Sequence, residues 1–170
     1  MAAKIAYAAS YAADVATVFP ILTAQRFLED CAREIGADSW KVAVTLPPPA
    51  LVTQVDVRAP TGNIPAAFRR FVGHHVDISE KRTWNSPASD GSHRGTLTAR
   101  AVVGGRAAFV RGTLMLEPVA DAARFTVNAD IHVWLGLLSQ LASAKLRELL
   151  TSVLNDQTTV LNRWLATGGG

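Results

Sequence analysis

The sequence has little that would cross-link the chain, anchor it in a membrane or keep it unfolded. Cys31 is its one cysteine in 170 residues, so no intrachain disulfide can form. No run reaches the ~20 apolar residues of a membrane span, so we expect no stable membrane insertion. Only 18% of the residues are charged and 49% are apolar, which argues against disorder. We therefore expect one globular domain over residues 1–167, followed by a flexible tail over 168–170.

Positive charge is present but is not concentrated. The net charge is +3, and the arginines are scattered over predicted strands and helices instead of gathering on one face. Because nucleic-acid binding needs such a face, we expect no nucleic-acid partner. The apolar N-terminus alternates like a strand and is interrupted by Asp14 and Pro20, unlike a signal peptide. We therefore expect a cytoplasmic protein.

Alternating apolar and polar residues predict seven strands. They cover about residues 4–11, 40–46, 51–59, 76–84, 93–103, 106–116 and 123–133. The run Pro47-Pro48-Pro49 predicts a turn after the second strand, and Gly104-Gly105 predicts a hairpin before the sixth. The sixth strand is expected to end at Glu117-Pro118.

Helical spacing is found in three other places. After the first strand, the pattern predicts two helical pieces, with a kink or break at Pro20, a cap at Thr23 and a stop at Gly36. A short helix is predicted over residues 64–72, and a long one runs from just after Trp134 to near Trp164. The predicted apolar stripe of the long helix comprises Leu138, Leu141, Leu149, Val153, Val160, Leu161 and Trp164.

The order of these elements predicts an α+β fold. Strands joined by hairpins form a curved antiparallel β-sheet, and helices group on one side of it, with short helices after the first strand. Such a sheet wrapped around a long C-terminal helix encloses an apolar pocket. We therefore expect the protein to bind a hydrophobic small molecule in a cavity between sheet and helix, without catalysis and without a cofactor.

The same pattern resembles the START-like, or helix-grip (SRPBCC), superfamily, and within it the mainly actinobacterial domain-of-unknown-function family 2505. The residues behind the resemblance are Tyr7-Ala8-Ala9-Ser10, Asp14-Val15, Phe27-Leu28-Glu29, Ile64-Pro65, Phe68, Phe71-Val72-Gly73, Trp84, Gly91, Gly95 and Trp164-Leu165. The resemblance spans nearly the whole chain. It implies a helix-grip fold and binding of a lipid, sterol, polyketide or hormone, with cyclases and dehydratases as a minority.

The fourth predicted strand carries the main candidate site. Glu80, Arg82 and Trp84 share one face with Val76 and Ile78, because alternate side chains of a strand point the same way. If that face lines the pocket, Arg82 could hold a carboxylate or phosphate; a solvated pair at the sheet's edge is the alternative. The predicted ligand-binding positions are Val76, Ile78, Glu80, Arg82, Trp84, Leu97, Phe125, Val127, Ile131, Leu141, Leu149 and Val153.

No residue pattern in the chain predicts a catalytic or metal centre. His74 and His75 are adjacent on a strand and so point to opposite faces, which prevents them from easily sharing an ion. Asp130 and His132 fall on the face opposite the apolar residues of the seventh strand, so we expect them to point outward.

Two other functions stay open. The chain could be an interaction or dimerisation module with a filled cavity, in which the outer sheet face, the helix or Trp134 contacts a second copy. It could also be an enzyme of the cyclase or dehydratase type, with Glu80 as acid or base beside Arg82.

Overall fold

The structure is a computed structural model that describes residues 3–46, 50–62, 66, 69, 73–103, 105–134 and 139–168. Its elements are β1 (Ala3–Tyr11), α1 (Val15–Leu22), α2 (Gln25–Glu34), β2 (Ser39–Thr45), β3 (Leu51–Pro60), β4 (His75–Trp84), β5 (His93–Val103), β6 (Arg106–Val119), β7 (Ala122–Val133) and α4 (Ser139–Ala166). The strands form one antiparallel sheet in the order β1-β7-β6-β5-β4-β3-β2. The predicted α+β fold class is thus confirmed.

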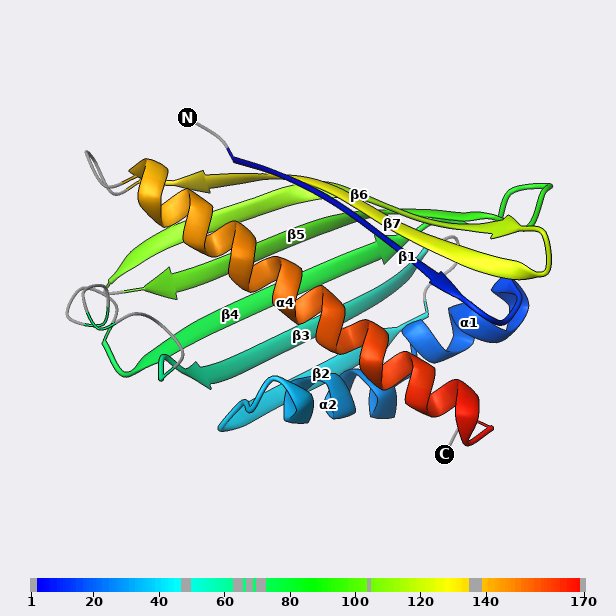
Figure 1. Ribbon diagram of the computed structural model, residues 1–170, viewed down its shortest axis with the longest axis horizontal. Helices are drawn as coiled ribbons and strands as arrows, with labels where there is room; N and C mark the ends of the chain where they lie inside the picture. Colours follow the sequence, from blue (N-terminus) through cyan, green and yellow to red (C-terminus); the bar gives the residue numbers. More distant parts are fainter. Residues whose placement is uncertain are drawn as a thin grey trace.

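One face of the sheet, here called the inner face, carries the helices. Figure 1 shows α4 running diagonally across it, with α1 and α2 beside the C-terminal half of α4. The alternation along strand β7 distinguishes the two faces of the sheet. Phe125, Val127 and Ile131 are buried toward the helices, whereas Asp130 and His132 are exposed on the outer face. The predicted outward direction of Asp130 and His132 is confirmed.

The first two helices differ from the prediction at their junction. Asp14 caps α1, and its Oδ1 accepts a hydrogen bond of 2.8 Å from the Thr17 backbone N–H. Helix α1 continues through Pro20, and Thr23 is its C-cap, with a hydroxyl that donates to the Phe19 carbonyl at 2.9 Å. The expectation that Thr23 caps α2 is therefore wrong, because its side chain is bound to the preceding helix. The predicted stop at Gly36 is confirmed by its left-handed φ of 72°.

Strand β6 is longer than predicted and includes Pro118. Its pairing with β5 ends at Leu116, but pairing with β7 continues as far as Val119. Pro118 therefore lies where β6 has a neighbour on one side only, and proline is tolerated at such an edge because it lacks the N–H that a second neighbour would need.

The buried side of α4 also differs from the predicted stripe. Its buried residues are Ser143, Leu154, Gln157, Val160 and Leu161. Two residues of the predicted stripe, Leu141 and Leu149, are 50% and 38% exposed. Val160 and Leu161 confirm the end of the predicted stripe. In the first half of the helix, Leu146 and Leu150 pack against the core instead of Leu141 and Leu149, so that part of the stripe was predicted on the wrong side.

Some predictions lie outside the described residues. They are the Pro47-Pro48-Pro49 turn, most of the short helix over 64–72, Gly104 of the hairpin pair, Leu138 of the stripe and the end of the tail. Ala66 and Arg69 belong to that short helix and are helical. Among the described helices, none is long and apolar enough to cross a membrane.

Candidate functional site

A buried ion pair lies on the inner face of β4. The Nε atom of Arg82 lies 2.7 Å from Oε1 of Glu80, and Arg82 as a whole is only 4% exposed. Strand β4 is an internal strand between β3 and β5, and it turns both side chains toward the helices. The alternative of a solvated pair at the sheet's edge is therefore wrong for this pair.

The neighbours of the pair on the sheet offer few polar groups. Arg82 is flanked by Thr53 on β3 and Leu97 on β5, and Glu80 is flanked by Val55 and Ala99. Thr53 and Leu97 are buried. The pair is therefore surrounded mostly by apolar surface, where charges are poorly screened and their interaction is strong.

Groups from β1, α2 and α4 face the pair from the other side of the interior. Burial raises the pKa of the Tyr11 phenol to about 12, although a contact with Thr158 and the charge of Arg82 lower it. Burial likewise raises the pKa of the Cys31 thiol to about 12, against the lowering effect of Arg82. The charge of Arg82 thus acts on both the phenol and the thiol.

Several N–H donors in this interior have no hydrogen-bond partner among the described residues. They are Nη1 of Arg82, Nε1 of Trp84 and Nε2 of Gln157. The Arg82 Nε is close to Glu80, but its N–H does not point along a hydrogen bond. An unsatisfied buried donor costs about 1–3 kcal/mol, so this interior is suited to hydrogen-bond acceptors that the chain itself does not supply.

Aromatic rings close the α1 end of the inner face. Trp84 is 1% exposed and meets Phe19 of α1 edge-on, with ring centroids 5.4 Å apart. His93 stacks on Phe19 at 3.6 Å, and burial lowers the pKa of its imidazole. Phe125 lies 6.4 Å from Trp84. These rings form an apolar wall at the end of the space that holds the Glu80–Arg82 pair.

The remaining predicted ligand-binding residues separate into three groups. Leu97, Phe125, Val127 and Ile131 are buried on the inner face, on the same side of the sheet as Arg82. Val76, Ile78 and Val153 are half-buried. Leu141 and Leu149 are exposed, away from the buried core. Contact of these residues with a ligand stays a prediction.

Sequence reasoning missed the polar groups opposite β4. Tyr11 shares a face of β1 with Tyr7, and that alternation could have placed both phenols inside. The Tyr7 hydroxyl donates to the Leu154 carbonyl at 3.1 Å, which ties β1 to α4. The burial of Gln157 could not be predicted, because an isolated polar residue on a helix is usually solvent-exposed.

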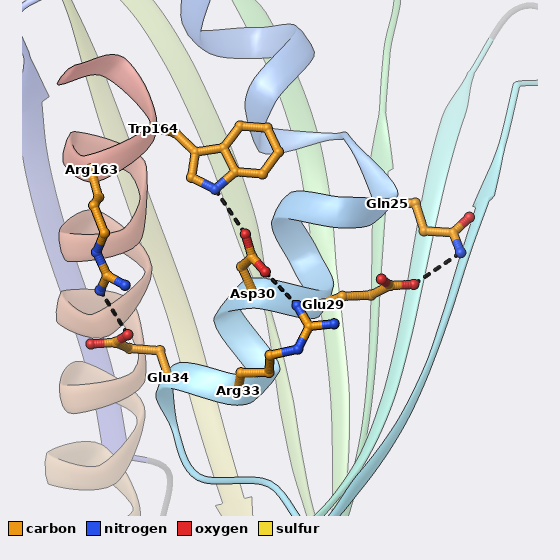
Figure 2. A network of polar contacts seen from close by, with 7 residues as sticks. All are labelled: Gln25, Glu29, Asp30, Arg33, Glu34, Arg163 and Trp164. Carbon is orange, nitrogen blue, oxygen red and sulfur yellow. Dashed lines mark hydrogen bonds and ion pairs between the residues drawn. The ribbon is translucent and has the colours of Figure 1, made fainter. Parts of the chain in front are cut away.

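A set of contacts between α2 and the end of α4, here called the clasp, holds the long helix over the site (Figure 2). The Trp164 indole donates to Oδ2 of Asp30 at 3.0 Å, and Arg163 pairs with Glu34 at 2.7 Å. Asp30 also pairs with Arg33 of its own helix. The clasp therefore ties the C-terminal end of α4 to α2.

The outer face has two open depressions of ≈ 360 and ≈ 350 Å³. They lie over β2 to β6 beside exposed cations such as Arg58, Lys81 and Arg111, and neither is lined by Glu80 or Arg82. Within the described part of the chain, no three histidine, cysteine or acidic side chains group as metal ligands. Both depressions lie on the outer face, whereas the inner face holds the buried Glu80–Arg82 pair and the unpartnered N–H donors that make it the candidate site.

Solved structures share this architecture at low sequence identity. TTHA0849 from Thermus thermophilus is 12% identical, with a TM-score of 0.65 over 99% of this chain and 100% of its own. Ara h 8.0201 is 12% identical, with a TM-score of 0.54 over 95% and 99%. A norcoclaurine synthase point mutant from Thalictrum flavum, solved with a transition state analogue, is 12% identical, with a TM-score of 0.58 over 100% and 98%. These similarities show the helix-grip fold.

No protein with a curated function matches the sequence. A family model described as "Protein of unknown function (DUF2505)" matches residues 6–165. That span includes the Glu80–Arg82 pair, the aromatic wall and the clasp. Since the match covers nearly the whole chain, the protein belongs to this DUF2505 family of the helix-grip fold.

Proposed function

We propose that the protein binds a hydrophobic small molecule between the inner face of the sheet and α4, and that it does so without catalysis. The observation that carries the proposal is the Glu80–Arg82 pair, which is held among apolar residues with the Arg82 Nη1 unpartnered. Apolar walls supply affinity through burial, at roughly 25 cal/mol per Å², and a few polar groups orient the ligand. We expect this binding to take place in the cytoplasm.

A pair of matched substitutions tests where binding occurs. Ala99 is on the inner face beside Glu80, whereas Thr98 is exposed on the outer face of the same strand. Ala99→Phe should fill the space near the pair and lower the affinity for the uncharged dye Nile red at least tenfold. Thr98→Phe should leave the affinity for Nile red unchanged. Equal affinities for wild type and both variants would place the dye elsewhere and contradict the proposal.

The position of Glu80 also supports an enzymatic alternative. Its carboxylate is 23% exposed and adjoins Arg82, so it could exchange a proton with a ligand in the same space. A cyclase or dehydratase of this kind would release an altered molecule. Incubation with polyketide-like substrates, followed by mass analysis, would reveal a product that disappears with Glu80→Gln.

Exposed aromatic residues support the other alternative, a homodimer. Trp134 is 80% exposed after β7, and Phe109 is 40% exposed on the outer face. Sedimentation over a range of protein concentrations would detect such a dimer, and Trp134→Ser should abolish it if the indole lies in the contact.

A further inference from the structure

We infer that the polar end of the ligand is an uncharged carbonyl oxygen, as in a ketone or an ester, and that it is bound by Arg82. This inference rests on the proposed function and names the class of ligand. It excludes a fatty acid or another carboxylate, and it excludes an ammonium head group.

The first argument is the kind of polar atom left unpartnered. Nη1 of Arg82, Nε2 of Gln157 and Nε1 of Trp84 are N–H donors, and all three residues are at most 4% exposed. Among the described residues, the other two with an unpartnered buried atom, His93 (Nδ1) and Ser143 (Oγ), can donate or accept. Arg82 and Trp84 come from β4, whereas Gln157 comes from α4 on the opposite side of the space. Donors need acceptors, and a carbonyl oxygen accepts two hydrogen bonds and donates none.

Gln157 lies in the same part of the interior as Arg82. Burial raises the pKa of the Tyr11 phenol, and the Arg82 charge and a contact with the Gln157 side chain lower it, which places Gln157 beside that hydroxyl. The Gln157 Nε2 nevertheless makes no hydrogen bond of normal geometry with the described residues. One oxygen near Tyr11 could therefore be approached by an amide from the helix and a guanidinium from the sheet.

The second argument is charge. Glu80 already neutralises Arg82 at 2.7 Å in surroundings that are mostly apolar. A ligand carboxylate at Nη1 would bring a second negative charge close to Glu80, where screening is weak and like charges repel. A ligand ammonium at the same place would bring a second positive charge close to the Arg82 guanidinium, where like charges also repel. An uncharged acceptor pairs with the free donor and avoids both penalties.

Three probes with the same naphthalene body test the inference. They are 2-ethylnaphthalene, 2-acetylnaphthalene and 2-naphthoate, measured with the wild-type protein at pH 7 by calorimetric or fluorescence titration. We expect the ketone to bind at least tenfold more tightly than both others. This expectation is stringent, because water solvates the ketone better than the ethyl compound, and a purely apolar pocket would favour the ethyl compound.

Two variants identify the groups responsible. Gln157→Leu should reduce the ratio of the affinity for the ketone to the affinity for the ethyl compound several-fold. Glu80→Gln should raise the affinity for naphthoate relative to the affinity for the ketone at least tenfold, since it removes the repelling charge. The wild-type probe series needs no variant, so the inference is testable even if a variant fails to fold.

The outcomes separate the two proposals. If all three probes bind but the ethyl compound matches or exceeds the ketone, the head-group inference fails while hydrophobic binding stands. If naphthoate binds most tightly, the uncharged class is wrong and Arg82 acts as an anion site. If no probe binds and Nile red does not bind either, hydrophobic binding itself fails, and the inference fails with it.

Discussion

Arg82 carries a full positive charge in a place where little else is polar. Only Glu80 compensates it directly, through an ion pair in which Arg82 is 5% and Glu80 23% exposed. Such pairs add little net stability, yet removing one partner leaves the other charge buried and uncompensated. The pair as a whole therefore adds little to folding, whereas the loss of one partner should be costly.

Substituting Arg82 alone should show how much stability is lost when one partner of the pair is missing. Arg82→Met leaves Glu80 without its counter-charge and should lower the free energy of unfolding by about 3 kcal/mol. The double variant Glu80→Gln/Arg82→Met should lose clearly less free energy of unfolding than Arg82→Met does. On the outer face, Arg58 and Asp77 form a pair in which both side chains are more than half exposed, so Arg58→Met should cost under about 1 kcal/mol. Urea denaturation measures all three; equal costs for Arg82→Met and Arg58→Met would contradict the burial argument.

The buried thiol of Cys31 should make the stability of the fold depend on pH in the alkaline range. Burial raises the pKa of its thiol from 9.0 to about 12 in the folded protein. The unfolded chain thus loses this proton first, and the free energy of unfolding should fall as the pH rises from about 9 toward 12, by about 1 kcal/mol at pH 10. Urea denaturation at pH 8 and pH 10 measures the loss. Cys31→Ala should show a smaller loss, since only groups such as Tyr11 then contribute; an unchanged loss would rule out this thiol as the cause.

At the scale of single residues, the sequence was sufficient to place Glu80, Arg82 and Trp84 on one face, because the two-residue period of a strand is a local property. It was not sufficient to decide whether that face is buried. That depends on Leu97 from the next strand and on Gln157, which is more than 70 residues further along the chain.

Helix α4 is positioned by the clasp at its C-terminal end. The Trp164 indole packs edge-on against Phe27, with centroids 5.7 Å apart, and donates its N–H to Asp30. Trp164→Phe keeps an aromatic ring but removes the hydrogen bond, so it should lower the free energy of unfolding by about 1 kcal/mol. Arg163→Gln breaks an exposed pair and should cost under about 0.5 kcal/mol. Thermal denaturation compares the two, and a larger cost for Arg163→Gln would contradict this account of the clasp.

The elements themselves were largely predictable, and the exceptions have tertiary causes. Strand alternation and the glycine stop at Gly36 are local, and both predictions are confirmed. The first half of the α4 stripe was predicted wrongly, because Leu146 and Leu150 pack against the core on the side where the polar Ser143 is also buried. The length of β6 was predicted too short because Pro118 is acceptable only where a strand has one neighbour, and neighbours are not visible in the sequence.

For the whole molecule, the order of elements was enough to predict a helix-grip fold, and the solved structures share it at 12% identity. The space between sheet and helix could not be predicted, because it depends on how closely α4 approaches β4. That approach depends on contacts such as Trp164–Asp30, between residues more than 130 positions apart.

The most direct test of a hydrophobic ligand is native mass spectrometry of freshly purified protein, followed by organic extraction and identification of whatever is released. We expect a discrete added mass that is lost on denaturation and an extracted apolar molecule that carries a carbonyl group. A clean mass of the chain alone, together with no thermal stabilisation by a panel of lipids and polyketides, would contradict the binding account and favour the interaction module.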